Sequence, residues 1–247
     1  MHPTHLRTLE ATLSRTTTLF RSALGAAVLG SALLLAGCGA PAAPVATGTP
    51  KPEPEFGSIG GTPEPIETGN TVEPTEPAAD GFTQLFDELN LLSVQVPSDW
   101  TDVDGSPFTT SDGQEWASIV ASTDIAAYSQ TYSVSGVEFA GEPMPEGVTP
   151  EALQGFLESV ANYFISDCDQ IDSDPAYDDG TYVGYQAGFE NCGGTDTEGF
   201  AIVAVDNAST HLVFLRAQIA GEDDPAAVYD VLVRSFIANI TRAAASK

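Results

Sequence analysis

Short runs of alternating apolar and polar residues between positions 81 and 241 predict most of a folded domain. The run at 91–100 begins as a strand, because Val94 and Val96 alternate with polar residues. Pro97 ends this strand, since proline cannot donate a hydrogen bond to a neighbouring strand. The same kind of pattern predicts further strands at 115–123, 132–141, 181–190, 200–206 and 211–221.

Two amphipathic helices are predicted from the spacing of their apolar residues and from their first residues. Thr149 can cap and Pro150 can open a helix over 149–165, whose apolar side chains recur every three or four positions. Asp224, followed by proline, starts a second helix near the C-terminus in the same way. A short helix is predicted to begin at Asp124.

The order of these elements predicts an α+β fold. Strands that follow one another through short links, such as the turn at 206–209, form antiparallel rather than parallel sheets. We therefore expect an antiparallel sheet covered by two main helices.

The first 37 residues have the pattern of a signal peptide. Arginines near the N-terminus precede an uncharged apolar run at 23–37, which is too short to span a bilayer comfortably. Residues 35–38, Leu-Ala-Gly-Cys, resemble the lipobox of bacterial lipoproteins, which implies cleavage before Cys38 and acylation (palmitate) of that cysteine. Such an anchor would hold the protein on the extracytoplasmic side of the cell membrane. The alternative is an ordinary secretory signal with a chance cysteine.

Composition divides the rest of the chain into three parts. Residues 38–80 are rich in proline, threonine and glutamate and poor in large apolar residues, which predicts a disordered tether. Residues 81–241 have the length and apolar content of a single globular domain, and 242–247 form a flexible tail.

The chain is strongly acidic, with a formal net charge of -27 at pH 7. Its two lysines, Lys51 and Lys247, lie outside the predicted domain. Nucleic acid is therefore excluded as a partner, because phosphate binding needs lysine and arginine to displace counterions. Anionic lipid head groups would also repel the domain, so membrane attachment must come from the lipid.

Besides Cys38, the predicted mature chain contains two cysteines, Cys168 and Cys192. Outside the cytoplasm such a pair is usually a disulfide, and two free buried thiols are the alternative. Zinc is disfavoured because two thiolates lack the further ligands that it needs.

An acidic run at 167–180 is the weak candidate for a metal site. Carboxylate oxygens at this density could hold calcium, whereas a solvated acidic turn is the simpler interpretation. No other cofactor is expected. The candidate ligands are Asp167, Asp169, Asp172, Asp174, Asp178 and Asp179.

The sequence offers no clear catalytic constellation. His211 is expected at the surface because it follows a turn, and no Gly-x-Ser-x-Gly motif accompanies it. A pair of carboxylates for glycoside hydrolysis cannot be selected from so many acidic residues. The aromatic residues around 181–190 predict either a core face or a groove for carbohydrate or peptide; they are Tyr177, Tyr182, Tyr185 and Phe189.

One short motif suggests a fold family. Val96, Pro97 and Trp100 resemble the strand end of Mog1/PsbP-like proteins, in which a Val-Pro-x-x-Trp turn packs its tryptophan under the sheet edge. The resemblance extends to the order of elements over 81–240 and implies an α/β/α sandwich. It also implies a binding or assembly role more often than an enzymatic one.

These observations favour a membrane-anchored, extracytoplasmic lipoprotein that acts as a non-catalytic binding or accessory module. Its partner would be an envelope protein or a small ligand. The alternatives are an envelope hydrolase with an acid pair that the sequence does not locate, and a calcium-responsive surface protein.

Overall fold

The computed structural model describes residue 66 and the ranges 77–110, 113–145, 147–171, 175–221 and 223–240, all within one compact unit of the chain. The predicted signal peptide with Cys38, most of the predicted tether and the predicted tail at 242–247 lie outside these residues.

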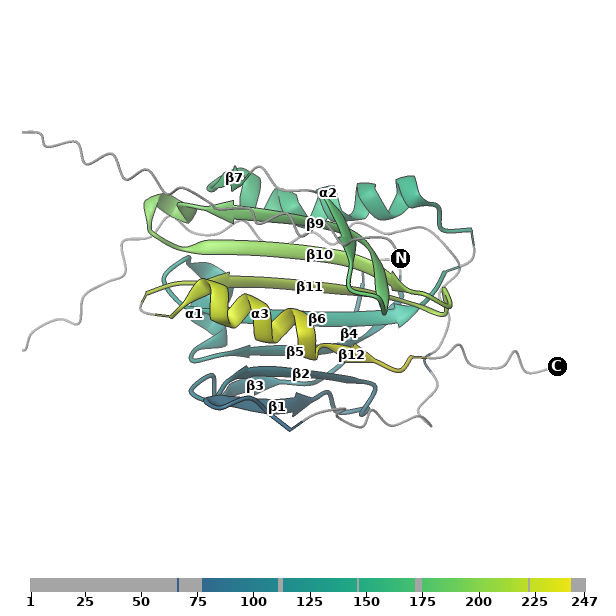
Figure 1. Cartoon of the computed structure of the whole chain (residues 1–247), viewed down its shortest axis with the longest axis horizontal. Helices are drawn as coiled ribbons and strands as arrows, with labels where there is room; N and C mark the ends of the chain where they lie inside the picture. Colours follow the sequence, from purple (N-terminus) through teal and green to yellow (C-terminus); the bar gives the residue numbers. More distant parts are fainter. Residues whose placement is uncertain are drawn as a thin grey trace, which may run out of the picture. The chain divides into compact units, whose positions relative to one another are not determined.

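A nine-stranded antiparallel sheet runs through the centre of the fold, in the order β3-β5-β6-β11-β10-β9-β7 with two short strands attached (Figure 1). The attached strands are β4, which pairs with β5, and β8, which pairs with β9. The strands are β3 (Asp102–Asp104), β4 (Phe108–Thr109), β5 (Glu115–Ser122), β6 (Gly136–Pro143), β7 (Asp169–Ile171), β8 (Ala176–Asp178), β9 (Tyr182–Glu190), β10 (Glu198–Asp206) and β11 (His211–Ile219).

A second, three-stranded sheet has the order β1-β2-β12. It consists of β1 (Phe82–Phe86), β2 (Leu92–Pro97) and β12 (Ile237–Ala238). Asp87 holds the turn between the first two strands, because its carboxylate accepts hydrogen bonds from the backbone N–H groups of Leu91 at 2.7 Å and Leu92 at 2.6 Å. Burial nevertheless raises the pKa of Asp87 above its ordinary value.

Three α-helices lie among the described residues: α1 (Ile125–Gln130), α2 (Pro150–Ile165) and α3 (Pro225–Ser235). A short 3₁₀ helix, η1, spans Cys192–Gly194. The predicted caps Thr149 and Asp224 are confirmed, since their side chains accept hydrogen bonds from the first turns of α2 and α3. Asp124 caps α1 in the same way.

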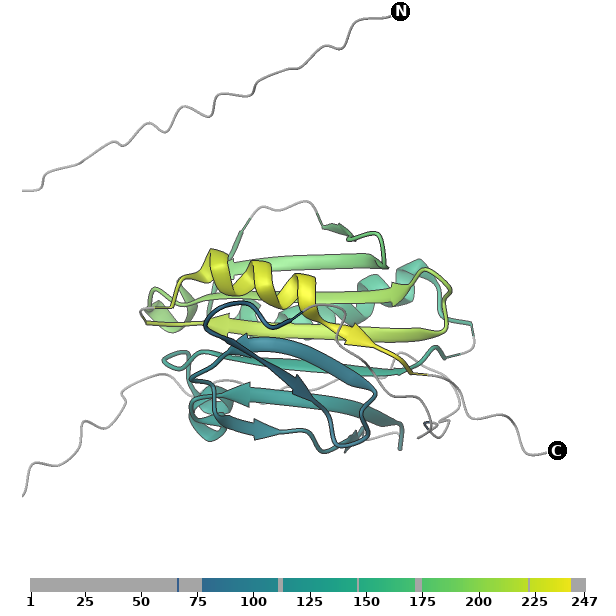
Figure 2. The ribbon, with the colours of Figure 1, turned by 60° about the horizontal axis from the view of Figure 1, so that its bottom comes forward.

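The two faces of the large sheet are covered differently. Helix α2 packs on one face, where its Phe156 and Leu157 contact β10 residues such as Ala201 and Val203. The three-stranded sheet and α3 lie on the opposite face, as the two views of the ribbon show (Figures 1 and 2). Alternate residues of one strand therefore enter two different cores.

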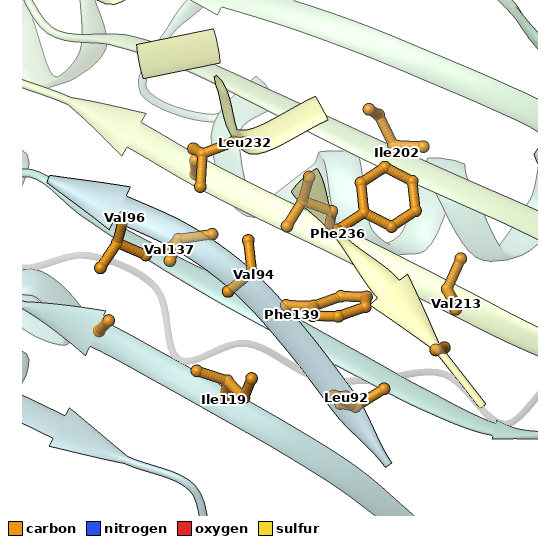
Figure 3. Close-up of a cluster of buried hydrophobic side chains, with 14 of the residues drawn as sticks. Leu92, Val94, Val96, Ile119, Val137, Phe139, Ile202, Val213, Leu232 and Phe236 are labelled. Atoms are coloured by element: carbon orange, nitrogen blue, oxygen red, sulfur yellow. The ribbon is translucent and has the colours of Figure 1, made fainter. Parts of the chain in front are cut away.

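The larger core lies between the two sheets and α3. Leu92, Val94 and Val96 of β2 gather with side chains of the large sheet and of the C-terminal segment (Figure 3). Trp100 is 2% exposed in the same cluster, and its backbone N–H group donates to the carbonyl of Pro97 at 3.0 Å, which confirms the turn that the sequence motif predicts. Ile66, from the predicted tether, also packs against this core.

The prediction of an antiparallel α+β fold is confirmed in its coarse form, because the described residues form antiparallel sheets with three α-helices. The expectation that two helices cover one sheet was incomplete. β1, β2 and β12 form a separate sheet, and α3 shares its face of the large sheet with it. Among the described residues, no helix has both the length and the apolar character needed to cross a bilayer.

Candidate ligand-binding groove

A groove opens on the large sheet beside α3, where neither this helix nor the smaller sheet covers the outer strands. Its volume is about 520 Å³, which is within the range of small-molecule binding sites. The residues around it come from β7, β9, β10, β11 and the first half of α3: Ile171, Gln186, Ala187, Gly188, Glu198, Gly199, Phe200, Ile202, Ile219, Asp224, Pro225, Ala226, Tyr229 and Asp230.

The floor and the outer wall of the groove are apolar. Phe200, Ile202 and Ile219 belong to the larger core cluster, and they present their side chains on the face of the sheet that carries α3. Ile171 forms the outer wall on the edge strand β7 and is 37% exposed. Apolar surface of this kind favours the removal of an apolar ligand from water.

Gly188 keeps the groove open on β9. A Cβ atom built at this position would lie 3.7 Å from Cδ1 of Ile171, which is ordinary van der Waals contact, and would meet no backbone atom within 4 Å. The missing side chain is therefore space in the groove, and the backbone does not require glycine there.

Tyr229 and Gln186 form one polar margin of the groove. The Tyr229 hydroxyl donates to Oε1 of Gln186 at 3.2 Å, and its ring meets the ring of Phe200 edge-on with centroids 4.8 Å apart. Burial raises the pKa of Tyr229, so its hydroxyl stays protonated at neutral pH and acts as a hydrogen-bonding group.

Two acidic side chains mark the other end of the groove. Glu198 begins β10 and pairs with Ile219, the last residue of β11, while Asp224 precedes α3 a few residues later. Both side chains are exposed. The groove therefore combines an apolar floor with an acidic end, which suits the binding of an amphipathic molecule.

The aromatic residues that the sequence singled out do not form this groove. Tyr177 and Tyr182 pack around Phe236 in the larger core, and Phe189 is fully buried against Phe164. Tyr185 packs on the α2 face. The core interpretation of these residues is therefore confirmed, and the groove for carbohydrate or peptide at these positions is wrong.

The acidic residues around 167–180 are not brought together by the part of the chain that the structure describes. Asp169 pairs with Glu190 at one end of β9, whereas Asp178 pairs with Val183 near the other end. Seven residues of strand separate these two partners, which corresponds to about 23 Å. Asp172 and Asp174 lie outside the described residues.

Several of these carboxylates instead hold local structure. Asp169 accepts a hydrogen bond from the Asn191 amide at 3.0 Å, and Asp178 accepts one from the N–H group of Gly180 at 3.0 Å. Asp179 accepts from the Tyr177 hydroxyl and from the N–H group of Tyr182, both at 2.7 Å. The carbonyl of Asp167 accepts from the N–H group of Gly193. The described residues contain no group of three or more side chains placed to hold a metal ion.

His211 is buried, and the expectation that it lies at the surface is wrong. It is 7% exposed because its position on β11 turns the imidazole towards the larger core, where it meets the Tyr182 ring edge-on at 5.9 Å. Burial lowers the His211 pKa, and the Asp206 carboxylate 3.7 Å away opposes this shift. Among the described residues its Nε2 atom has no hydrogen-bond partner, while its Nδ1 atom lies 3.0 Å from the Thr210 hydroxyl.

Glu138 and Glu142 are two of the buried carboxylates among the described residues. Glu138 and Glu142 face the same side of β6 four residues apart, which places their Cα atoms about 13 Å from each other. Glu138 is moreover paired with Arg216. This pair does not form a glycosidase site, and the hydrolase alternative stays a prediction without assigned residues.

Cys168 and Cys192 are joined in a disulfide, with sulfurs 2.05 Å apart. The bridge connects the exit of α2 to the 3₁₀ turn after β9, and Cys168 directly precedes the edge strand β7. The predicted pairing is present, and it lies next to the outer wall of the groove.

The sequence analysis missed the groove, although one signal for it is visible. The residues of β9 that face α3 include Gly184, Gln186 and Gly188, so this strand carries small or polar side chains on one face. The opposite face carries Tyr185, Ala187 and Phe189, which pack under α2. A strand with one weakly apolar face marks a place where the sheet is not fully covered.

Comparison with known proteins shows similarity at the level of structure rather than sequence. No protein-family profile and no curated protein matches the sequence. The solution structure of the cyanobacterial PsbP protein (CyanoP) from Synechocystis sp. PCC 6803 is similar with a TM-score of 0.40 and 14% sequence identity, over 70% of this chain and 100% of that chain. At this level of similarity, nothing about ligands or partners transfers to this chain.

Proposed function

We propose that this protein is a lipid-anchored, extracytoplasmic binding module that takes a small amphipathic ligand into the groove beside α3. The open groove carries this proposal, because its outer wall, Ile171, is 37% exposed above an apolar floor, and a ligand in the groove would remove this side chain from water. Its acidic and hydroxyl groups are exposed or hydrogen-bonded rather than grouped around a reactive side chain, which fits binding without catalysis.

The N-terminal sequence supports the location. The Leu-Ala-Gly-Cys motif at 35–38 supplies an acylation site, and residues 39–80 supply a stretch of chain between the lipid and the domain. An acidic domain on such a stretch is repelled by anionic head groups, which would keep the groove away from the membrane surface.

Replacing Cys38 with serine is expected to release the protein from the membrane. The substitution removes the thiol that would carry the acyl chain, so the chain that begins at position 38 would lack its predicted anchor. Membrane fractionation with mass spectrometry of the N-terminal peptide tests this. Wild-type protein in the soluble fraction, with an unmodified Cys38, would contradict the proposed anchor.

Replacing Gly188 with valine is expected to weaken binding in the groove by at least about tenfold, or about 1.4 kcal/mol. The new side chain would fill the space beside Ile171 without meeting backbone atoms. Valine also suits a strand better than glycine, so stability should be unchanged or higher. The measurement is fluorescence titration of the full chain, carrying Cys38→Ser, with the neutral apolar dye phenylnaphthylamine.

The matched control for this experiment is Val183→Leu. Val183 lies on the same strand, is 37% exposed, and faces the side of the sheet opposite to the groove. This variant should bind the dye as the unsubstituted chain does. If Gly188→Val binds the dye equally well, or if the chain does not bind it at all, the groove is not the ligand site.

A further inference from the structure

We infer that the ligand of the groove carries a cationic head group, which binds at the end formed by Glu198 and Asp224, while its apolar body lies along the floor. This inference rests on the proposed function and names the chemistry of its ligand. It follows from the charged side chains around the groove and from the ion pairs and hydrogen bonds that they already form.

The acidic side chains at the groove differ in whether they are neutralised. Asp230 forms an ion pair with Arg234 of the next helical turn at 2.5 Å, so its charge is compensated. The exposed side chain of Glu198 makes no hydrogen bond or ion pair with the described residues. Asp224 uses Oδ1 to cap α3 through the N–H groups of Ala226 and Ala227, which leaves Oδ2 for a ligand.

No lysine or arginine is among the described residues that line the groove. An anionic head group would therefore meet two carboxylates and no cationic side chain, and the partial positive charge at the start of α3 is already used by Asp224. A cationic head group would meet charges of the opposite sign, and the electrostatic complementarity favours it.

The arrangement of these residues also determines how the ligand is oriented in the groove. Glu198, Phe200 and Ile202 follow one another on the same face of β10, so the distance from the acidic end to the far part of the floor is about 13 Å. Tyr229 and Gln186 lie beside this far part, because Gln186 pairs with Ile202. The ligand is thus expected to be an elongated amphiphile with its charge at one end.

Competition between amphiphiles with the same chain tests the inference. Dodecyltrimethylammonium, dodecyl maltoside and dodecyl sulfate are titrated, below their micelle-forming concentrations, against phenylnaphthylamine bound to the full chain. The cationic compound should displace the dye at the lowest concentration and the sulfate at the highest. The preference should weaken with added salt, because ions screen exposed charges.

The variants Glu198→Gln and Asp224→Asn assign this preference to the two residues. Asparagine caps helices as well as aspartate does, so Asp224→Asn removes the charge and keeps the start of α3. Each substitution should reduce the preference for the cation by about two- to fivefold, as expected for exposed charge pairs, and the double variant should multiply the two effects.

The control removes two exposed charges elsewhere, by Asp99→Asn with Glu115→Gln. Glu115 lies on β5, four strands away from β9, so only the long-range field of this acidic chain changes. An equal loss of preference in this control would overturn the inference, as would an unchanged preference in the double variant. If the dye binds and Gly188→Val blocks it, but maltoside competes as well as the cation, the groove function stands and the cationic ligand is wrong.

Discussion

Replacing Arg216 with methionine is expected to lower the free energy of unfolding by about 3–5 kcal/mol. Arg216 on β11 lies directly opposite Glu138 on β6, and the two side chains form an ion pair in which both residues are more than nine-tenths buried. Removing the arginine leaves the carboxylate buried without its counter-charge. Such a group must either remain charged at high cost or take up a proton.

The surroundings of this pair explain why water cannot replace the arginine. Tyr128 of α1 lies beside Arg216, and its ring sits so close to Gly136 that a Cβ atom there would be 2.5 Å from the ring. Burial raises the pKa of Tyr128 to about 12, although its hydrogen bond with Arg216 acts in the opposite direction. Helix α1 thus closes the site from the outside.

Urea unfolding of three variants checks this prediction. The double variant Arg216→Met, Glu138→Met should recover most of the loss, because removing both charges removes the uncompensated one. Arg234→Met is the exposed control, since the side chains of Arg234 and Asp230 are 77% and 50% exposed, and should cost less than about 1 kcal/mol. A single Arg216 variant as stable as the Arg234 variant would show that the buried pair does not contribute as expected.

Much of the fold can be predicted from the sequence because local patterns determine it. Thr149 and Asp224 were predicted to cap helices, and in the structure they do so. The side-chain oxygen of each accepts hydrogen bonds from the first turn of its helix. The turn at 206–209 was equally visible, since Asp206 accepts hydrogen bonds from the N–H groups of Ala208 and Thr210. These interactions involve residues only a few positions apart.

The parts that were missed depend on residues far apart in the chain. Ile237 and Ala238 form a two-residue strand only because Ser93 and Leu92 of β2 lie beside them. Strands as short as β7 and β8 carry no periodic signal, and their pairing partner β9 defines them. The burial of His211 likewise follows from the rings of the core around it, and a turn in the sequence cannot reveal it.

The candidate groove leaves only a weak signal in the sequence, for a related physical reason. It exists because α3 and the smaller sheet stop short of the outer strands, and this depends on how three elements distant in sequence divide one face. Phe200 and Ile202 look like ordinary core residues in the sequence, and they are indeed largely buried. Only Gly188 on the neighbouring strand, which has no side chain to cover Phe200, indicates a groove at this position rather than a fully packed core.

Removing the disulfide by Cys168→Ala with Cys192→Ala is expected to lower the free energy of unfolding by about 3–4 kcal/mol. The bridge spans 24 positions, and in the chain-entropy model a loop of this length accounts for that amount. Thermal unfolding should occur about 6–15 °C lower, as expected for a domain of roughly 160 residues. Reducing agent should lower the melting temperature of the unsubstituted chain by a similar amount and leave the double variant unchanged.

The same substitution should loosen one wall of the groove more than the rest of the molecule. Cys192 is fully buried with Phe164 and Phe189, so the bridge ties Cys168 to a packed cluster just before β7 begins. Without it, β7 is an edge strand held by three residue pairs, and Ile171 at its end loses its fixed position. Hydrogen exchange of the β7 amides should therefore speed up in the double variant while β10 and β11 stay protected. Equal protection of β7 with and without the bridge would mean that strand pairing alone positions this wall.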